Sequence, residues 1–363
     1  MLRLGQAMAL VSSALLVMPL QAEAWDRGEV KTFAVLPDGS SGPEGLEVDR
    51  AGNVYVTAFG FTATGSASGE GQLFVFDPHG RLLRQLSVVG SSTHLLGLRF
   101  HPGTGALLVN DFGAGVVLEV NPHTGASRVF MTLPALPNPG GAGLNDITFD
   151  KAGNVYVSDS FQGVVWMTSA TGGVASVWVD DALLRTTGVP PFGANGMRFN
   201  KHETALFIAN SGNDTVIKVP VVGGAPGSAG TAGTPAVFVN SINGADGLLI
   251  DGHDNLWVAA NQADEIVVVD PTGKTIAKLG DFGGVKRGTP SDLLFPASIR
   301  FSGKDLLVTN LALDLRLFSP EYATGDSQWT AQVSHYTISR LHARIPGTED
   351  KPGHDHDDDR NRD

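Results

Sequence analysis

Four side chains that carry oxygen ligands recur in this sequence at multiples of about 50 residues. They are Glu44, Asn145, Asn195 and Asp246. Two carboxylates and two amide oxygens are hard donors, which suit Ca²⁺ better than Zn²⁺ or copper. The two carboxylate charges would also neutralise one divalent ion. We therefore predict that these four residues bind one divalent cation, with Ca²⁺ favoured and Zn²⁺, Mn²⁺ or Mg²⁺ as alternatives.

The four residues occupy one position of an internal repeat. Each repeat has a short apolar alternation, a polar turn and a second apolar run, and a hairpin with a Pro or Gly turn follows most of these pairs. The six repeats start 52, 49, 50, 51 and 51 residues apart, at Glu44, Leu96, Asn145, Asn195, Asp246 and Ala297. Four strands per repeat without helical periodicity are typical of a propeller blade. We predict an all-β, six-bladed β-propeller with four-stranded antiparallel blades, in which equivalent residues meet at the axis.

The ends of the chain predict three regions. Arg3, an apolar run over 7–20 and the small residues of Ala22-Glu23-Ala24 indicate a signal peptide over 1–24, cut after Ala24, and hence a periplasmic or secreted protein. The propeller is expected over 25–345, with segment 31–37 closing the last blade against a strand near 334–341. Residues 346–363 are expected to be a disordered acidic tail whose histidines offer a weak alternative metal site.

Composition excludes several classes of function. The chain has 363 residues, 42% of them hydrophobic and 17% charged, and it has no cysteine. Disulfides, zinc-thiolate sites and thiol catalysis are therefore excluded. The net charge of −12 argues against nucleic acid as a partner. After residue 24 no segment reaches membrane-spanning length, and we expect a monomer that acts on a small molecule.

A simpler interpretation of the repeated polar position is that short polar residues satisfy the backbone of turns at strand starts. It suits Asn145 or Asn195 taken singly. It explains Glu44 poorly, because two carboxylates that face a narrow axis repel each other unless a cation lies between them. The cation site is therefore the favoured interpretation.

The chain resembles the senescence marker protein/gluconolactonase family, which includes regucalcin, over about residues 30–341. The resemblance rests on Glu44-Gly45-Leu46, Asn145-Asp146, Asn195-Gly196-Met197 and Asp246-Gly247-Leu248. It implies that these Glu, Asn and Asp residues hold one catalytic divalent cation in a funnel, where the enzyme hydrolyses lactones or phosphoesters. Members that act on sugar lactones commonly have Arg where this chain has Gly143, and a Glu-x-Pro-x-Trp motif that Glu44 does not begin. Both departures argue against a sugar acid lactone.

The predicted function is an exported, metal-dependent hydrolase of lactone or ester bonds. The cation would polarise the carbonyl, and the resemblance implies that Asp246 is both ligand and base. Asp146 is a second candidate carboxylate, with the capping of a turn amide as the alternative. His94 is a candidate proton shuttle above the axis, with an inert surface-loop histidine as the alternative. Substrate contacts are predicted for Asn145, Asn243 and Asn310.

Two other functions stay open at this point. The repeated Ala-Gly-Asn-Val-Tyr-Val segments resemble NHL-type propellers, so the alternative is a non-catalytic propeller that binds a protein or glycan and keeps a structural cation. A virginiamycin-type lyase is disfavoured, because those propellers use a catalytic histidine and a different repeat number. Specificity is expected in the loops at 59–71, 133–143, 180–194 and 281–296, whose apolar residues imply a partly apolar mouth.

Overall fold

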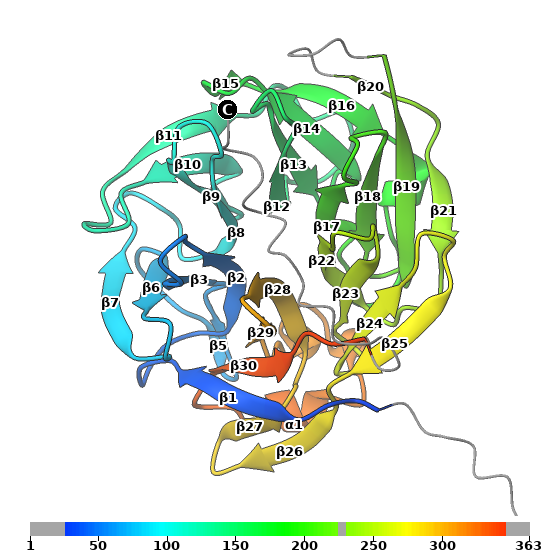
Figure 1. The fold of residues 1–363 in the computed structure, drawn as a ribbon. Coiled ribbons are helices and arrows are strands. Elements are labelled where there is room, and N and C mark those ends of the chain that lie inside the picture. Colours follow the sequence, from blue (N-terminus) through cyan, green and yellow to red (C-terminus); the bar gives the residue numbers. More distant parts are fainter. Residues whose placement is uncertain (1–25, 224–229, 346–363) are drawn as a thin grey trace, which may run out of the picture.

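The computed structural model of the protein describes residues 26–223 and 230–345. Six sheets of four main strands surround a central axis, and within each blade these main strands are antiparallel (Figure 1). This confirms the predicted six-bladed propeller. The predicted signal peptide and the predicted tail lie outside the described residues.

Each blade begins with its innermost strand at the axis and ends at the rim. The innermost strands are β2 Pro43–Val48, β8 Leu95–Phe100, β12 Leu144–Phe149, β17 Ala194–Phe199, β22 Ala245–Ile250 and β28 Pro296–Ser302. The second strands are β3 Val54–Ala58, β9 Leu107–Asp111, β13 Val155–Asp159, β18 Ala205–Asn210, β23 Leu256–Ala260 and β29 Asp305–Asn310. The third strands are β6 Gln72–Phe76, β10 Val116–Val120, β14 Val164–Thr168, β19 Thr215–Val222, β24 Glu265–Val269 and β30 Thr337–His342. The outer strands are β7 Leu82–Ser87, β11 Ser127–Thr132, β16 Ser176–Asp180, β21 Ala236–Val239, β25 Thr275–Leu279 and β1 Val30–Val35.

Several short strands and helices lie outside the main strands of the blades. Two small hairpins are formed by β4 Phe61–Thr62 with β5 Gly65–Ser66, and by β26 Phe282–Lys286 with β27 Thr289–Asp292. Strand β15 Gly173–Val174 adds in parallel to β11, and β20 Thr231–Ala232 pairs with the end of β19. The described helices are η1 Ala182–Leu184, η2 Leu315–Leu317, η3 Pro320–Tyr322 and α1 Ser327–Thr330. None of them is long and apolar enough to cross a membrane.

The ring closes by pairing the two ends of the propeller. Strand β1 lies antiparallel to β30, with Val30 opposite Leu341 and Val35 opposite Thr337, as Figure 1 shows in blue and red. The outer strand of the last blade therefore comes from the start of the propeller, as the sequence predicted. This arrangement leaves no break between the first and last blades.

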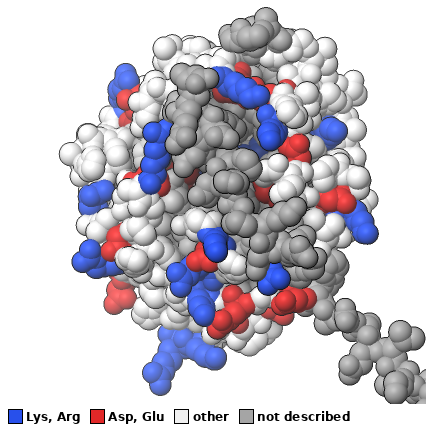
Figure 2. All heavy atoms as spheres, in the orientation of Figure 1, with Lys and Arg blue, Asp and Glu red and all other residues white. Residues whose placement is uncertain are grey.

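The core consists of apolar layers between neighbouring blades. Leu46 and Val56 of the first blade, for example, pack with Leu307 and Ile338 of the last. Equivalent layers fill the other five interfaces, and a separate apolar cluster lies around the axis. On the outside, Lys and Arg are interspersed with Asp and Glu over the face in Figure 2.

Every innermost strand contains a β-bulge at the position that the repeat analysis singled out. In β2 the pairing shifts between Pro43 and Leu46, so that Glu44 and Gly45 lie in the bulge. The same shift occurs in the other five innermost strands. Bulges re-aim side chains and are frequent beside active sites. Here the bulge directs the second residue of each innermost strand towards the axis.

The glycine after this residue allows neighbouring innermost strands to approach each other. A Cβ atom on Gly45 would lie 2.4 Å from the carbonyl oxygen of Leu96, and one on Gly196 would lie 2.5 Å from that of Asp246. The Glu-Gly, Asn-Gly and Asp-Gly pairs of the sequence thus reflect close strand packing. Asp146 and Ser298 are the exceptions at this position.

The Ala-Gly-Asn-Val-Tyr-Val segments form the turn between the first and second strands of a blade. The Asp49 carboxylate accepts bonds from the backbone of Ala51 and Asn53, and from the side chains of Asn53 and Tyr55. Asp150 and Asp251 bind the matching residues of the third and fifth blades. These residues hold the turn between the first two strands, because their side chains form hydrogen bonds within that turn.

Candidate metal centre

The four predicted ligands meet at one buried cavity on the axis. Each is the second residue of an innermost strand, in the first, third, fourth and fifth blades. Glu44, Asn145, Asn195 and Asp246 are 3–5% exposed and line a cavity of about 20 Å³. A cavity of this size holds about one water molecule or ion. The residues that the sequence separated by 50 to 200 positions are therefore neighbours, as the propeller geometry required.

Two serines fix the orientation of the two asparagine amides. The Ser160 hydroxyl donates to the carbonyl of Ala194 at 2.7 Å and therefore accepts the Nδ2–H of Asn145 at 3.1 Å. In the next blade, Ser211 donates to Ala245 at 2.7 Å and accepts from Asn195 at 2.9 Å. Because each hydroxyl has a single proton, the amide nitrogen must face the serine. The Oδ1 atoms are thereby reserved as acceptors for the cavity.

A fifth oxygen-bearing residue, Asn261, lines the same cavity. Its Nδ2 donates to Asp246 Oδ2 at 3.0 Å, and its buried Oδ1 has no hydrogen-bond partner. Asn261 follows β23 directly, at the position that Ser160 and Ser211 occupy after their own second strands. The repeat position at the start of the innermost strands does not include Asn261. The repeat position directly after the second strands does, and it is the sequence signal for this residue.

Burial and neighbouring negative charges raise the pKa values of both carboxylates in the cavity. Burial raises the pKa of Glu44 well above its ordinary value, and the nearby charges of Asp246 and Asp146 raise it further. Burial likewise raises the pKa of Asp246 to about 7, although the hydrogen bond from Asn261 opposes the shift. Two carboxylates that share a dry cavity cannot both ionise unless positive charge joins them.

The donors fit a hard divalent cation. Glu44 Oε2 and Asn261 Oδ1 are buried acceptors without hydrogen-bond partners, and such atoms are costly unless something binds them. In the described part of the chain, no three Asp, Glu, His or Cys side chains gather into a metal site. The set here instead combines two carboxylates with amide oxygens. This is the chemistry that Ca²⁺ prefers, and Mg²⁺ also binds such oxygens.

Asp146 lies beside this site but does not line the cavity. Its carboxylate accepts from the backbone N–H of Met197 at 3.0 Å and forms an ion pair with Arg198 at 2.6 Å. Burial raises its pKa, while the charges of Arg99 and Arg300 oppose that shift. Asp146 thus binds the innermost strand of the next blade, with arginines around it, and its charge acts on the cavity from a distance.

The other predicted residues lie outside the cavity. The ring nitrogens of His94 are 2.7 Å from the carbonyl oxygen of Phe59 and 3.2 Å from Ser66 Oγ. Asn243 is exposed in a loop. Asn310 is fully buried inside the last blade, where its amide donates to Asp292, Thr337 and Ser339 and accepts from Leu294. The structure therefore brings together the predicted metal ligands but not these three residues.

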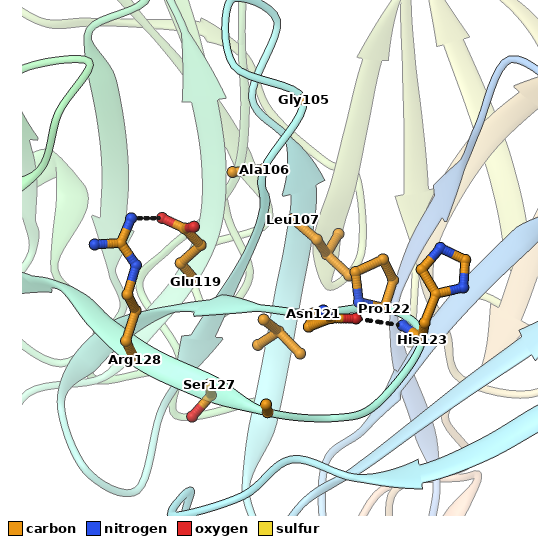
Figure 3. Close-up of a pocket in the computed structure, with 11 residues that line it drawn as sticks. Gly105, Ala106, Leu107, Glu119, Asn121, Pro122, His123, Ser127 and Arg128 are labelled. Atoms are coloured by element: carbon orange, nitrogen blue, oxygen red, sulfur yellow. Dashed lines mark hydrogen bonds and ion pairs between the residues drawn. The ribbon is translucent and has the colours of Figure 1, made fainter.

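A larger hollow of about 530 Å³ lies on the outer part of the second blade (Figure 3). Its charged residues Glu119 and Arg128 pair with each other at 2.6 Å, and Asn121 binds the backbone of His123 within its own turn. The predicted site residues do not line it. Because its two charged side chains pair with each other, the hollow lacks the convergent unpaired charges of a reaction site.

The serine that orients Asn145 gives a direct test of the donor set. Ser160→Ala removes the acceptor for the Asn145 amide, so that the amide is free to rotate. We expect Ca²⁺ affinity to fall about 10–100-fold, the usual effect of losing such a supporting bond. Isothermal titration calorimetry measures the change. Ser169→Ala, in an exposed outer turn of the same blade, is the matched control, and equal affinities of both variants would contradict the assignment.

Comparison with known proteins gives a family and several similar folds. A family model described as the SMP-30/gluconolactonase/LRE-like region matches residues 88–280. No curated protein matches the chain significantly.

Solved structures of the same architecture share little sequence with this chain. A luciferin-regenerating enzyme aligns with a TM-score of 0.58 and 15% identity, covering 87% of this chain and 95% of that one. A gluconolactonase from Xanthomonas campestris aligns at 0.57 and 12%, covering 88% and 90%. A calcium-binding regucalcin from Agrobacterium tumefaciens aligns at 0.56 and 14%, covering 86% and 97%. At these identities the similarity concerns the fold.

Proposed function

Because the chain belongs to the SMP-30/gluconolactonase/LRE-like family, we propose that it hydrolyses lactones or related esters with one bound divalent cation, Ca²⁺ being favoured. The observation that carries this proposal is the axial cavity. There Glu44 and Asp246 line one small cavity together with the amide side chains of three asparagines, and Glu44 Oε2 has no hydrogen-bond partner. A lactonase-type activity agrees with the family, and the metal dependence is the part that the cavity adds.

Glu44, Asn145, Asn195 and Asp246 would hold the cation, and Asn261 would orient Asp246. The cation would supply Lewis-acid polarisation of the carbonyl oxygen of the substrate. Asp246 Oδ2 is bound by Asn261, which leaves Oδ1 to accept a proton from the attacking water. The water oxygen then bonds to the carbonyl carbon, the ring C–O bond breaks, and the proton passes to the departing alkoxide. The product is a hydroxy acid.

The test is a panel of lactones, carboxylic esters and phosphotriesters assayed with and without EDTA. We expect hydrolysis of at least one lactone or ester, its loss in EDTA, and its return when Ca²⁺ is added in excess. Mn²⁺, Mg²⁺ and Zn²⁺ in parallel samples identify the preferred ion. Turnover that persists fully in EDTA would contradict the metal-dependent mechanism.

The alternative, a non-catalytic propeller with a structural cation, is supported by the apolar side chains that pack around the cavity. In that case the cation would only hold the blades together at the axis. Chelation would then lower the melting temperature, but no member of the panel would be hydrolysed. Export through the segment over 1–24 is a separate proposal that depends on the sequence.

A further inference from the structure

The cavity has two chemically different halves. The blades that supply Asn145, Asn195, Asp246 and Asn261 are consecutive and form its polar side. The lining from the other three blades and their loops is apolar except for Glu44, and it consists of Phe59, Leu96, Phe295, Leu311 and Leu313. Phe192, from the loop between the third and fourth blades, adds one apolar ring beside the polar side. A group bound at the cation would therefore meet polar ligands on one side and a hydrocarbon wall on the other.

A ring of phenylalanines continues this wall away from the cavity. Its members, here called the phenylalanine cover, are Phe59, Phe61, Phe112, Phe161, Phe192 and Phe318. Successive rings lie 4.9–5.9 Å apart around a closed circuit. Phe59 and Phe192 are almost fully buried and line the cavity, whereas Phe161 is 39% exposed. The cover thus reaches from the candidate cation site to the surface.

The histidine that stacks on the cover is already hydrogen-bonded. Both ring nitrogens of His94 have partners, and the ring itself stacks on Phe61 at 4.7 Å. Gly143 has no room for a side chain, because a Cβ atom there would lie 2.9 Å from the Phe161 ring. A substrate hydroxyl placed here would lose its water and find few new partners.

Building on the proposed function, we propose that the substrate is a lactone or ester with an apolar alkyl or aromatic substituent, which the phenylalanine cover binds, and not a polyhydroxylated sugar lactone. Entry requires the rings above the cavity to separate, which exposes apolar surface to water. An apolar substituent covers that surface again as it enters, whereas a polyol leaves it wet. The polar half of the cavity binds the ester group, and the cover selects what is attached to it.

A series of lactones with one ring size tests this proposal. We would measure kcat/KM for δ-valerolactone, δ-octalactone, δ-decalactone and D-glucono-δ-lactone, each corrected for its uncatalysed rate. For substituents in contact with the cover we expect a rise of about three- to fourfold per added methylene. D-glucono-δ-lactone should be poorer than δ-decalactone by at least about 10²-fold. A value for the sugar lactone that equals or exceeds that of δ-decalactone would overturn the proposal.

Phe161→Ala locates the effect on the cover. We expect this variant to lose several-fold in kcat/KM with δ-decalactone and to change little with δ-valerolactone, which is too short to reach Phe161. Phe130→Ala, on the outer strand of the second blade, is the matched control and should change neither value. Equal losses of Phe161→Ala on both lactones would argue against recognition by the cover.

Binding measured without turnover separates the two proposals. The lactam 6-pentylpiperidin-2-one resists hydrolysis and has the same alkyl chain as δ-decalactone. Calorimetry should show that it binds more tightly than unsubstituted piperidin-2-one, with a negative heat-capacity change. If the alkyl lactam binds but no lactone or ester is hydrolysed, the cover is supported and the hydrolase proposal fails. If the alkyl chain adds no affinity, the cover proposal fails whether or not the enzyme is active.

Discussion

Asp246→Ala should abolish cation binding and hydrolysis together while leaving the propeller folded. Among the residues that the structure describes, Asp246 and Glu44 are the two carboxylates that line the cavity, and Asn261 donates a hydrogen bond to Asp246. Its loss removes half of the negative charge that balances a divalent ion, and it also removes the proposed base. Loss of a single charge-stabilising group from an active site lowers kcat about 10²–10³-fold, and we expect a decrease at least that large.

Hydrolysis, Ca²⁺ calorimetry and circular dichroism should be measured on the same preparation. The matched control is Asp38→Ala, whose side chain is 91% exposed and lies outside the cavity. A variant that binds Ca²⁺ normally and hydrolyses substrate at the wild-type rate would refute the site. Loss of Ca²⁺ binding with unchanged turnover would refute the catalytic role of the cation but not the cation site.

Glu44→Gln should stabilise the cation-free protein at basic pH and at the same time weaken its response to Ca²⁺. In the cation-free folded protein the pKa of Asp246 is about 7, against an ordinary value of 3.8. A raised carboxyl pKa contributes stability that is complete below about pH 4 and is lost as the pH rises through 7. Burial and the charge of Asp246 likewise raise the pKa of Glu44, so ionising Glu44 in the cation-free protein also costs unfolding free energy as the pH rises. Glutamine keeps the shape of Glu44 and removes one of the repelling charges.

The wild-type protein in EDTA should therefore lose melting temperature between pH 5 and pH 8, and the stabilisation by Ca²⁺ should grow over the same interval. Glu44→Gln should melt above wild type in EDTA at pH 8 and below it in Ca²⁺. Glu47→Gln is a control of opposite sign, since Glu47 lies 3.4 Å from Arg300 and 3.6 Å from Arg99 and its loss leaves buried arginine charge. Destabilisation of both variants in EDTA would contradict this prediction, because it would show that the charge of Glu44 is already balanced in the cation-free protein.

The repeat made most of the fold and the core of the candidate site predictable from the sequence. A period of about 50 residues with turn signals specifies blades, because strands of this length bury their faces only against neighbouring blades. Closure by segment 31–37 was predictable from its likeness to another outer strand, and β1 does pair with β30. Once the ring closes, equivalent residues of innermost strands must meet. For that reason Glu44, Asn145, Asn195 and Asp246 could be grouped without a structure.

The surroundings of these four residues depended on tertiary contacts that a period does not encode. His94 was predicted above the axis from its place two residues before Leu96, and its ring packs on Phe61 and bonds to the carbonyl of Phe59, a pair of contacts that spacing alone does not specify. Phe59 and Phe112 of the phenylalanine cover directly follow β3 and β9, at the repeat position that Ser160, Ser211 and Asn261 occupy in their own blades. The partners that complete the cover, Phe61, Phe192 and Phe318, come from loops and insertions of unequal length, which follow no repeat. The sequence alone determines which side chains are equivalent, since equivalence is a property of spacing. Their neighbours, their burial and the orientation of their amides are decided only when the six blades pack, because each of these properties depends on atoms supplied by a different blade.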